Sequence, residues 1–112
     1  MTNDDVLSTL DAPIRAAFEA TNRGDSDAFV AAFAEDAVLN DWGRTFTGRD
    51  EIARWNTNEN IGVQSHFEAL AAMIEGDTTT VQIRVTGNGY NGGGAFVIAS
   101  DGEHITRWDI SG

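Results

Sequence analysis

Asp41 and Trp42 place a carboxylate beside a large aromatic ring, at the end of a run that alternates from Ala37 onward. A carboxylate in apolar surroundings can act as a general base, because the loss of surrounding water favours the uptake of a proton. A neighbouring indole can stack on a planar or apolar ligand. Structural roles compete with these. Asp41 can instead pair with Arg44 or Arg49 or cap the following turn, and the tryptophan can simply fill a core.

His66 and Glu68 lie two residues apart on a predicted strand, so their side chains share one face of the sheet. The pair could act as a general acid and base or as half of a metal site. A set of three metal ligands would need carboxylates from elsewhere, since the chain has two histidines and no cysteine. We therefore predict no metal site. His66 either assists a catalytic base or lies at the surface or in the pocket wall without a metal, and His104 is predicted to be solvated.

Residues 87–92, with the sequence GNGYNG, match the glycine pattern of dinucleotide-binding loops. Such a loop needs a helix after it, whose N-terminus receives the pyrophosphate. Residues 94–98 instead have the apolar character of a strand. We therefore predict a glycine-rich hairpin loop, with Asn88 and Tyr90 available to hydrogen-bond a ligand at its mouth.

Three helices are predicted in the first half of the chain, after a lead-in arm at residues 1–10. Asp11 can cap the first helix and Gly24 can end it, while Asp25 can cap the second. The third helix begins near Gly48. Apolar residues at helical spacing are predicted to face inward: Ile14, Ala17, Phe18, Ala28, Phe29, Ala32, Phe33, Ile52 and Trp55.

Strands make up most of the remaining chain. A strand is predicted over residues 37–42, with a short one at 45–47, because apolar and polar residues alternate there. Compact turns at 75–77 and 100–103 separate later strands. These later strands are predicted at about 63–74, 78–88, 94–100 and 104–110. Helices gathered on one face of a curved sheet give an α+β fold.

The composition is that of one globular domain spanning residues 1–112, with 41% hydrophobic residues. The absence of cysteine excludes disulfides, thiolate metal sites and a cysteine nucleophile. The net charge of −11 argues against nucleic-acid and anionic-membrane partners, since both would be repelled. No apolar run approaches the roughly 20 residues of a membrane span, and the N-terminus lacks the apolar region of a signal peptide. We therefore predict a cytoplasmic protein.

Four stretches resemble the nuclear transport factor 2-like superfamily, in its SnoaL-like branch of small bacterial proteins. They are residues 22–25 (NRGD), 33–41 (FAEDAVLND), 46–52 (FTGRDEI) and 104–108 (HITRW). The resemblance covers residues 11–110 and extends distantly to ketosteroid isomerase. It implies a cone-shaped, cystatin-like α+β fold, in which three helices and a curved mixed or antiparallel sheet enclose a cavity. It also implies a homodimer that packs through the convex face of the sheet.

The resemblance bears on Asp41 in two ways. In steroid isomerases of this superfamily the matching position holds the carboxylate that shuttles a proton. Those enzymes also use a tyrosine and a protonated aspartate to stabilise an oxyanion. The matching positions here are Ala17 and either Gly94 or Ala95, and none of these side chains donates a hydrogen bond. The steroid isomerase mechanism is therefore not predicted.

We predict a SnoaL-like domain that binds a small apolar or aromatic molecule without a cofactor. As an enzyme it would be an isomerase, cyclase or hydrolase, with Asp41 as the base and His66 assisting. Two alternatives remain, a non-catalytic ligand-binding or carrier domain and a structural dimerisation domain of the same fold. Substrate contacts are predicted from Phe18, Trp42, Trp55, Asn88, Tyr90 and Trp108.

Overall fold

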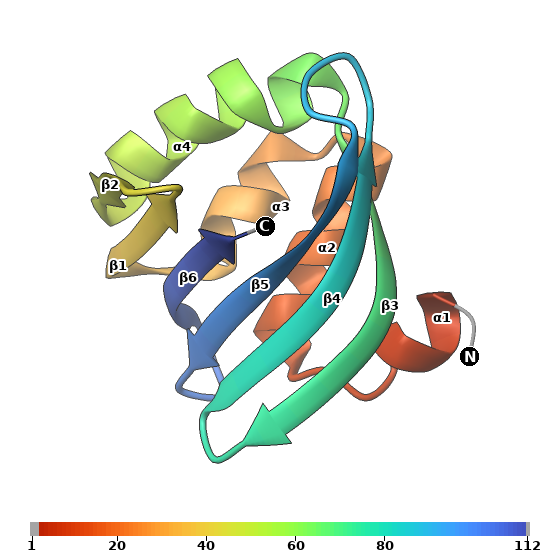
Figure 1. Ribbon diagram of the computed structural model, residues 1–112. Coiled ribbons are helices and arrows are strands. Elements are labelled where there is room, and N and C mark those ends of the chain that lie inside the picture. Colours follow the sequence, from red (N-terminus) through yellow and green to blue (C-terminus); the bar gives the residue numbers. More distant parts are fainter. Residues whose placement is uncertain (1–2, 112) are drawn as a thin grey trace.

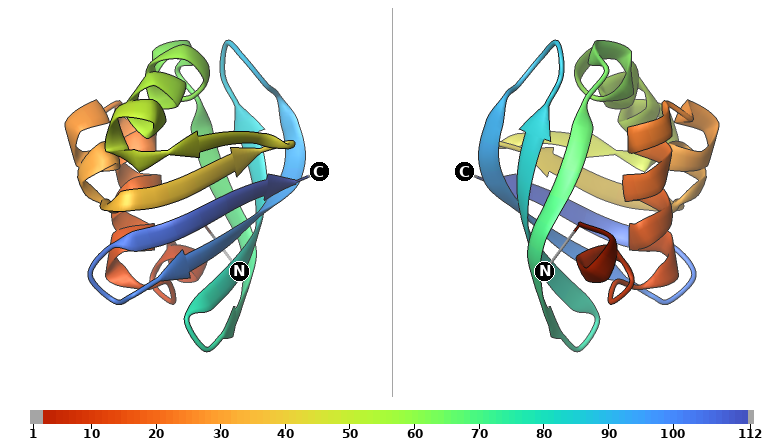
Figure 2. Two further views of the ribbon diagram at one scale, coloured as in Figure 1. Left: turned by 90° about the vertical axis from the view of Figure 1, so that its left-hand side faces the viewer. Right: turned by 90° about the vertical axis from the view of Figure 1, so that its right-hand side faces the viewer.

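Six strands form one curved sheet, and the helices lie on its inner side (Figures 1 and 2). The computed structural model describes residues 3–111. Its helical segments are α1 (Asn3–Leu7), α2 (Ala12–Arg23), α3 (Ser26–Ala31), α4 (Gly48–Glu59) and the short 3-10 helix η1 (Ile61–Val63). Its strands are β1 (Phe33–Asp41), β2 (Arg44–Thr47), β3 (His66–Glu75), β4 (Thr78–Thr86), β5 (Gly92–Ser100) and β6 (Ile105–Ser111).

The strand order is β2-β1-β6-β5-β4-β3, so the first and last parts of the chain meet in the middle of the sheet. β1 and β6 run parallel, with Leu39 opposite Trp108, and every other neighbouring pair is antiparallel. The predicted α+β fold with a curved, mixed sheet is confirmed. The glycine-rich segment before β5 is a hairpin loop, and no helix follows it.

The lead-in arm predicted for residues 1–10 is wrong for the part that the structure describes. Residues Asn3–Leu7 form α1, and Val6, Leu7 and Leu10 are buried. Their spacing gives one apolar face on a single helical turn, which packs against the sheet at β3. Because Asp4 and Asp5 lie in the same turn, the sequence of this segment reads as polar and its apolar face is not apparent. Residues 1 and 2 lie outside the described range.

The boundary between α2 and α3 follows the predicted capping residues. Gly24 has a left-handed φ of 74°, which ends α2. The Oδ1 atom of Asp25 accepts a hydrogen bond of 3.0 Å from the amide of Ala28 and so caps α3. Asp11 precedes α2, but its side chain makes no capping hydrogen bond. α3 ends earlier than predicted, because Phe33 already belongs to β1.

An aromatic cluster forms the core between α2, α3 and the sheet. The indole of Trp108 lies at its centre, with five phenylalanine rings at centroid distances between 4.9 and 6.3 Å. These rings belong to Phe18, Phe29, Phe33, Phe67 and Phe96. Their mutual burial fixes the sheet against the helices and leaves the space beside it, under α4, less completely filled.

Within residues 3–111, none of the helices has the length and apolar character needed to cross a membrane.

Candidate functional site

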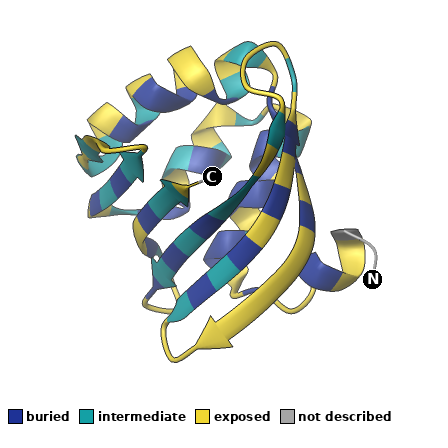
Figure 3. Cartoon of the chain, in the orientation of Figure 1, coloured by how far each residue is buried: buried dark blue, intermediate teal, exposed yellow. Residues whose placement is uncertain are grey.

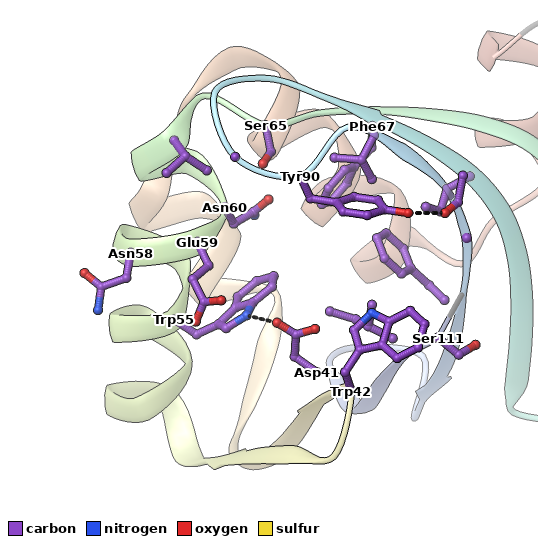
Figure 4. A pocket seen from close by; sticks show the side chains of 18 residues that line it. Asp41, Trp42, Trp55, Asn58, Glu59, Asn60, Ser65, Phe67, Tyr90 and Ser111 are labelled. Carbon is purple, nitrogen blue, oxygen red and sulfur yellow. Dashed lines mark hydrogen bonds between the residues drawn. The ribbon is translucent and has the colours of Figure 1, made fainter.

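A cavity of about 250 Å³ opens between the inner face of the sheet, α4 and the glycine-rich loop at residues 87–92 (Figure 4). This volume is slightly smaller than the range of about 300–1,000 Å³ that is usual for small-molecule pockets. The aromatic part of its wall consists of Trp42, Trp55, Phe67, Tyr90 and Phe96. The aliphatic part consists of Val63, Ile83, Val85 and Ile110.

Strand periodicity explains why these residues face the cavity. Side chains of a strand point alternately to its two faces, so Ile83 and Val85 of β4 share the inner face. Figure 3 shows this alternation of buried and exposed residues along β4. On β5, Gly93 and Gly94 both line the cavity, and the missing side chain of Gly94, which pairs with the inward-facing Ile83, leaves room within it. The wall is therefore apolar over most of its area.

Asp41, the last residue of β1, is the acid that the sequence placed at the site. Its side chain is only 13% exposed and lines the cavity. The Oδ2 atom accepts hydrogen bonds from Arg44 Nη2 at 2.6 Å and from Trp55 Nε1 at 3.0 Å. Among residues 3–111, no donor is bonded to the Oδ1 atom. One oxygen thus fixes the carboxylate, and the other is available to a ligand.

Arg44 holds this acid together with a second one, Glu59 at the end of α4. Its guanidinium donates to both Glu59 oxygens, at 2.6 and 2.8 Å, as well as to Asp41. The hydrogen bond to Glu59, followed by the attraction of both carboxylates, raises the pKa of Arg44 above its usual value. The guanidinium therefore remains charged at any working pH. The predicted ion pair with Arg44 and the predicted cavity position of Asp41 are both present.

The other candidate partner of Asp41 has a different role. Arg49 donates from Nε to the carbonyl oxygen of Phe33 at 2.9 Å, which ties the start of α4 to the start of β1. This contact helps to hold α4 over the cavity.

Trp42 projects from a two-residue turn between β1 and β2, and the residue is 67% exposed. It has a φ of 53° and Gly43 one of 87°, the left-handed pair that suits a tight hairpin of this kind. A bulky residue is unfavourable at such a φ. The turn places the indole beside Asp41 at the edge of the cavity (Figure 4).

Tyr90 lies across the cavity from Trp42 (Figure 4). It is 56% exposed, and its hydroxyl donates to the carbonyl oxygen of Gly93 at 2.7 Å. The loop that carries it is fixed at its base, where the amide of Asn88 donates to the carbonyl oxygen of Val63 at 2.8 Å. Two exposed aromatic rings therefore flank the opening, one on a strand turn and one on the loop.

His66 lies on the opposite face of the sheet. Its neighbours Ser65 and Phe67 line the cavity, so the alternation of β3 turns His66 outward. With Glu68, Arg84 and Thr86 it forms an exposed depression of about 190 Å³ on the outer face. Glu68 and His66 share a face as predicted, but the structure does not bring His66 together with Asp41.

Three of the predicted substrate contacts also lie away from the cavity. Phe18 and Trp108 are fully buried in the aromatic core. The side chain of Asn88 is exposed and donates to Gln64 Oε1 at 3.4 Å. Trp42, Trp55 and Tyr90 do line the cavity.

Phe67, Phe96 and Glu59 also line the cavity, although they are not among the residues predicted from the sequence. For Phe67 a signal was present, because it alternates with the exposed His66 and Glu68. Glu59 is brought to Arg44 only by the packing of α4 on β1, a contact across fifteen positions. Across residues 3–111, no three side chains of the metal-binding types gather closely enough to hold a metal ion.

Comparison with solved structures agrees with this geometry. A Sinorhizobium meliloti protein proposed to be a polyketide cyclase superposes with a TM-score of 0.82 at 25% identity, over 94% of this chain and 98% of that one. A hypothetical protein with a ketosteroid isomerase-like fold from Catenulispora acidiphila, in complex with trimethylamine, superposes with a TM-score of 0.75 at 24% identity. The match covers 90% of this chain and 85% of that one. A cystatin-fold protein from Novosphingobium aromaticivorans superposes with a TM-score of 0.72 at 19% identity, over 98% of this chain and 97% of that one. The last two likenesses show the fold alone.

The sequence has no significant match among curated proteins. The SnoaL-like domain family, in contrast, matches residues 14–111, which is most of the chain and includes the segments that build the cavity. The nuclear transport factor 2-like fold predicted from the four motifs is confirmed by the family match and by these structures. The chain therefore belongs to the SnoaL-like domain family.

Proposed function

We propose that the cavity binds a small, largely apolar molecule and that Asp41 exchanges a proton with it. The observation that carries this proposal is the Oδ1 atom of Asp41, which has no donor within the described residues and belongs to a mostly apolar cavity wall. Similarity to a protein proposed to be a polyketide cyclase supports a reaction of this kind. The site would act as a cofactor-independent isomerase, cyclase or hydrolase.

The geometry suits a base of fixed orientation. Arg44 and Trp55 hold Oδ2, so the carboxylate cannot turn freely and Oδ1 stays directed at the ligand. Proton removal from a carbon beside a carbonyl, and its return to another atom, would serve both isomerisation and ring closure. The apolar wall would exclude water from the reacting atoms.

A second candidate function is ligand binding without catalysis. It is favoured by the scarcity of donors for an oxyanion, which usually supplies a large part of such catalysis. The hydroxyl of Tyr90 already donates a hydrogen bond to the Gly93 carbonyl, and the indole N–H of Trp55 already donates one to Asp41. Neither group is therefore available to an oxyanion. Ala17 is buried in the core, and Gly94 has no side chain.

The two functions can be separated with small aromatic ketones in D2O, using NMR to follow exchange of the proton next to the carbonyl. Asp41→Asn should abolish any exchange that the protein catalyses, while the amide still accepts from Trp55 and keeps Tm close to wild type. Asp109→Asn is the matched control, because Asp109 is also a strand acid paired with an arginine, at 2.8 Å, and does not line the cavity. Unchanged exchange in Asp41→Asn would contradict a catalytic role. Retained ketone affinity without any exchange would identify a binder.

We also propose that the outer face of the sheet packs in a homodimer. β3 is an edge strand, and its far end is exposed (Figure 3). Met73 pairs with Thr80 on the face that also carries Glu68 and Arg84, and it is 62% exposed, as expected of an apolar residue on a surface that is covered in an assembly. Light scattering on wild type and on Met73→Glu tests this, with a dimer expected for the former and a monomer for the latter. A monomeric wild type would overturn it.

A further inference from the structure

The charge on the cavity wall is supplied by acids alone. Asp41 and Glu59 line the cavity, and none of the lining residues within 3–111 is basic. Arg44 bridges the two carboxylates but is not part of the wall. Two carboxylates against one guanidinium leave one negative charge, and the whole chain carries −11. A cation inside the cavity would therefore be stabilised, and an anion would be repelled.

Aromatic rings surround the exposed side of this acidic wall. Trp42 and Trp55 lie on either side of the Asp41 carboxylate, and Tyr90 lies across from them (Figure 4). The face of such a ring attracts an ammonium group, and tryptophan does so most strongly. Trp42 is too exposed to contribute to the hydrophobic core. Its left-handed φ is also unfavourable for a bulky residue, so neither packing nor turn geometry explains a tryptophan at this position. Unfavourable backbone conformations of this kind cluster at ligand sites.

The size of the cavity limits the ligand. Its volume of about 250 Å³ lies just below the range of about 300–1,000 Å³ that is usual for small-molecule pockets. It therefore favours a compact ligand, such as one ring with a short substituent.

We propose that this site takes a compact organic cation, a protonated amine or an iminium group attached to a single apolar ring. The inference rests on the proposed function only in taking the cavity as the ligand site. It does not require Asp41 to be a catalyst.

A cationic ligand also fits the scarcity of oxyanion donors. When a carboxylate removes a proton from a carbon next to an iminium group, the C–H bond breaks and an O–H bond forms on the carboxylate. The electron pair moves into the new C=C bond, and the C=N pair moves to nitrogen. The product is a neutral enamine, so no negative charge develops on the ligand and no oxyanion hole is needed.

Three near-isosteric probes test the proposal by isothermal titration calorimetry at pH 7: 2-phenylethylammonium, 2-phenylethanol and phenylacetate. We expect the ammonium to bind at least about tenfold more tightly than the alcohol, the factor that about 1.4 kcal/mol represents. Phenylacetate should show no binding. Equal or tighter binding of the alcohol, binding of the anion, or failure of all three to bind would each overturn the proposal.

Variants show whether the selectivity comes from the acidic wall. Glu59→Gln and Asp41→Asn should each reduce the preference for ammonium over alcohol, and Trp42→Ala should weaken the ammonium more than the alcohol. Asp109→Asn should leave both affinities unchanged, since Asp109 lies outside the cavity wall. Full selectivity in the Glu59→Gln, Asp41→Asn and Trp42→Ala variants would contradict the assignment to this wall.

The two proposals fail in different ways. If the alcohol binds best while proton exchange still depends on Asp41, the ligand class is wrong and the proposed chemistry stands. If the ammonium is selected but no exchange depends on Asp41, the ligand class stands and the site is a binder.

Discussion

Asp41 uses one carboxylate oxygen for structure and leaves the other to the cavity. Its Oδ2 atom joins β1 to α4 through Trp55 and to β2 through Arg44. This arrangement reconciles the two roles that the sequence left open, since an ion-paired acid and a cavity acid are the same residue here. The pairing with Arg44 adds little stability, because Arg44 is more than half exposed and solvent screens the interaction.

Trp42 is the residue at which stability and binding should conflict. Asparagine followed by glycine is the preferred pair for a two-residue hairpin turn with left-handed φ at both positions. Trp42→Asn should therefore stabilise the fold by about 1 kcal/mol, since it relieves an unfavourable φ and removes no core contact.

Chemical denaturation measures this gain, and calorimetry with 2-phenylethylammonium measures the accompanying loss of affinity. Trp42→Ala serves as the control, because alanine removes the ring without favouring the left-handed conformation. A lower midpoint for Trp42→Asn than for wild type would show that the indole stabilises the fold.

At the scale of elements, α4 is held over the cavity by a buried polar network. Asn60, only 1% exposed, donates to Thr21 of α2 at 3.2 Å and to Asn56 at 3.0 Å. Asn56 in turn donates to Ser26 of α3 at 3.1 Å. Buried amides without partners are costly, so this network fixes how the three helices meet.

Asn60→Ala should reduce the free energy of unfolding by about 1–3 kcal/mol, because Thr21 and Asn56 lose a buried partner. Asn58→Ala, on the exposed side of the same helix, should change it by no more than about 0.5 kcal/mol. Urea unfolding of both variants measures the difference. Similar values for the two would contradict a structural role for the network.

The cap of α3 should make stability depend on acid pH. The hydrogen bond from the Ala28 amide, opposed in part by desolvation, lowers the pKa of Asp25 below its ordinary value of 3.8. The folded state thus binds the proton less readily than the unfolded one. The cap's contribution is present above pH 4 and is lost as the pH falls through the folded-state pKa.

Thermal unfolding between pH 6 and pH 2 checks this dependence. Asp25→Asn should lose less Tm on acidification than wild type, because asparagine caps without titrating. Asp11→Asn is the matched control, since the Asp11 side chain makes no capping hydrogen bond. Identical pH profiles for wild type and Asp25→Asn would show that the cap does not contribute.

At the scale of the whole molecule, the charge is dominated by 18 acidic residues against 7 basic ones. The negative charge that would attract a cationic ligand also destabilises the folded state, because the acidic residues repel one another. The described arginine pairs are mostly exposed and contribute little attraction. Repulsion should therefore outweigh attraction at low salt.

Raising NaCl from 0.01 to 0.15 M shortens the screening length from about 30 to about 8 Å, so Tm should increase. Differential scanning calorimetry at pH 7 measures the shift. A neutral osmolyte at the same osmolality is the control for changes in water activity. A fall in Tm on adding salt would mean that the ion pairs outweigh the repulsion.

The sequence by itself determined most of the elements and the place of Asp41 at the end of β1. Local signals were sufficient for the cap at Asp25, for Gly24 at the end of α2 and for most of the strands, because each depends on neighbouring residues. The arm predicted at residues 1–10 was wrong because this segment contains α1, which packs against β3, a strand that is distant in sequence. Val6 and Leu10 are buried there, and this contact cannot be read from the neighbouring residues.

Tertiary structure decided which side chains meet. Alternation shows that His66 and Glu68 share a face of β3, and the packing of Phe67, on the other face, against Phe18 of α2 makes theirs the outer one. Phe18 and Trp108 are apolar enough for either a core or a cavity, and the packing of α2 on the sheet assigns them to the core. Glu59 reaches Asp41 through Arg44 because α4 folds back over β1, and this long-range contact gives the cavity its acidic wall.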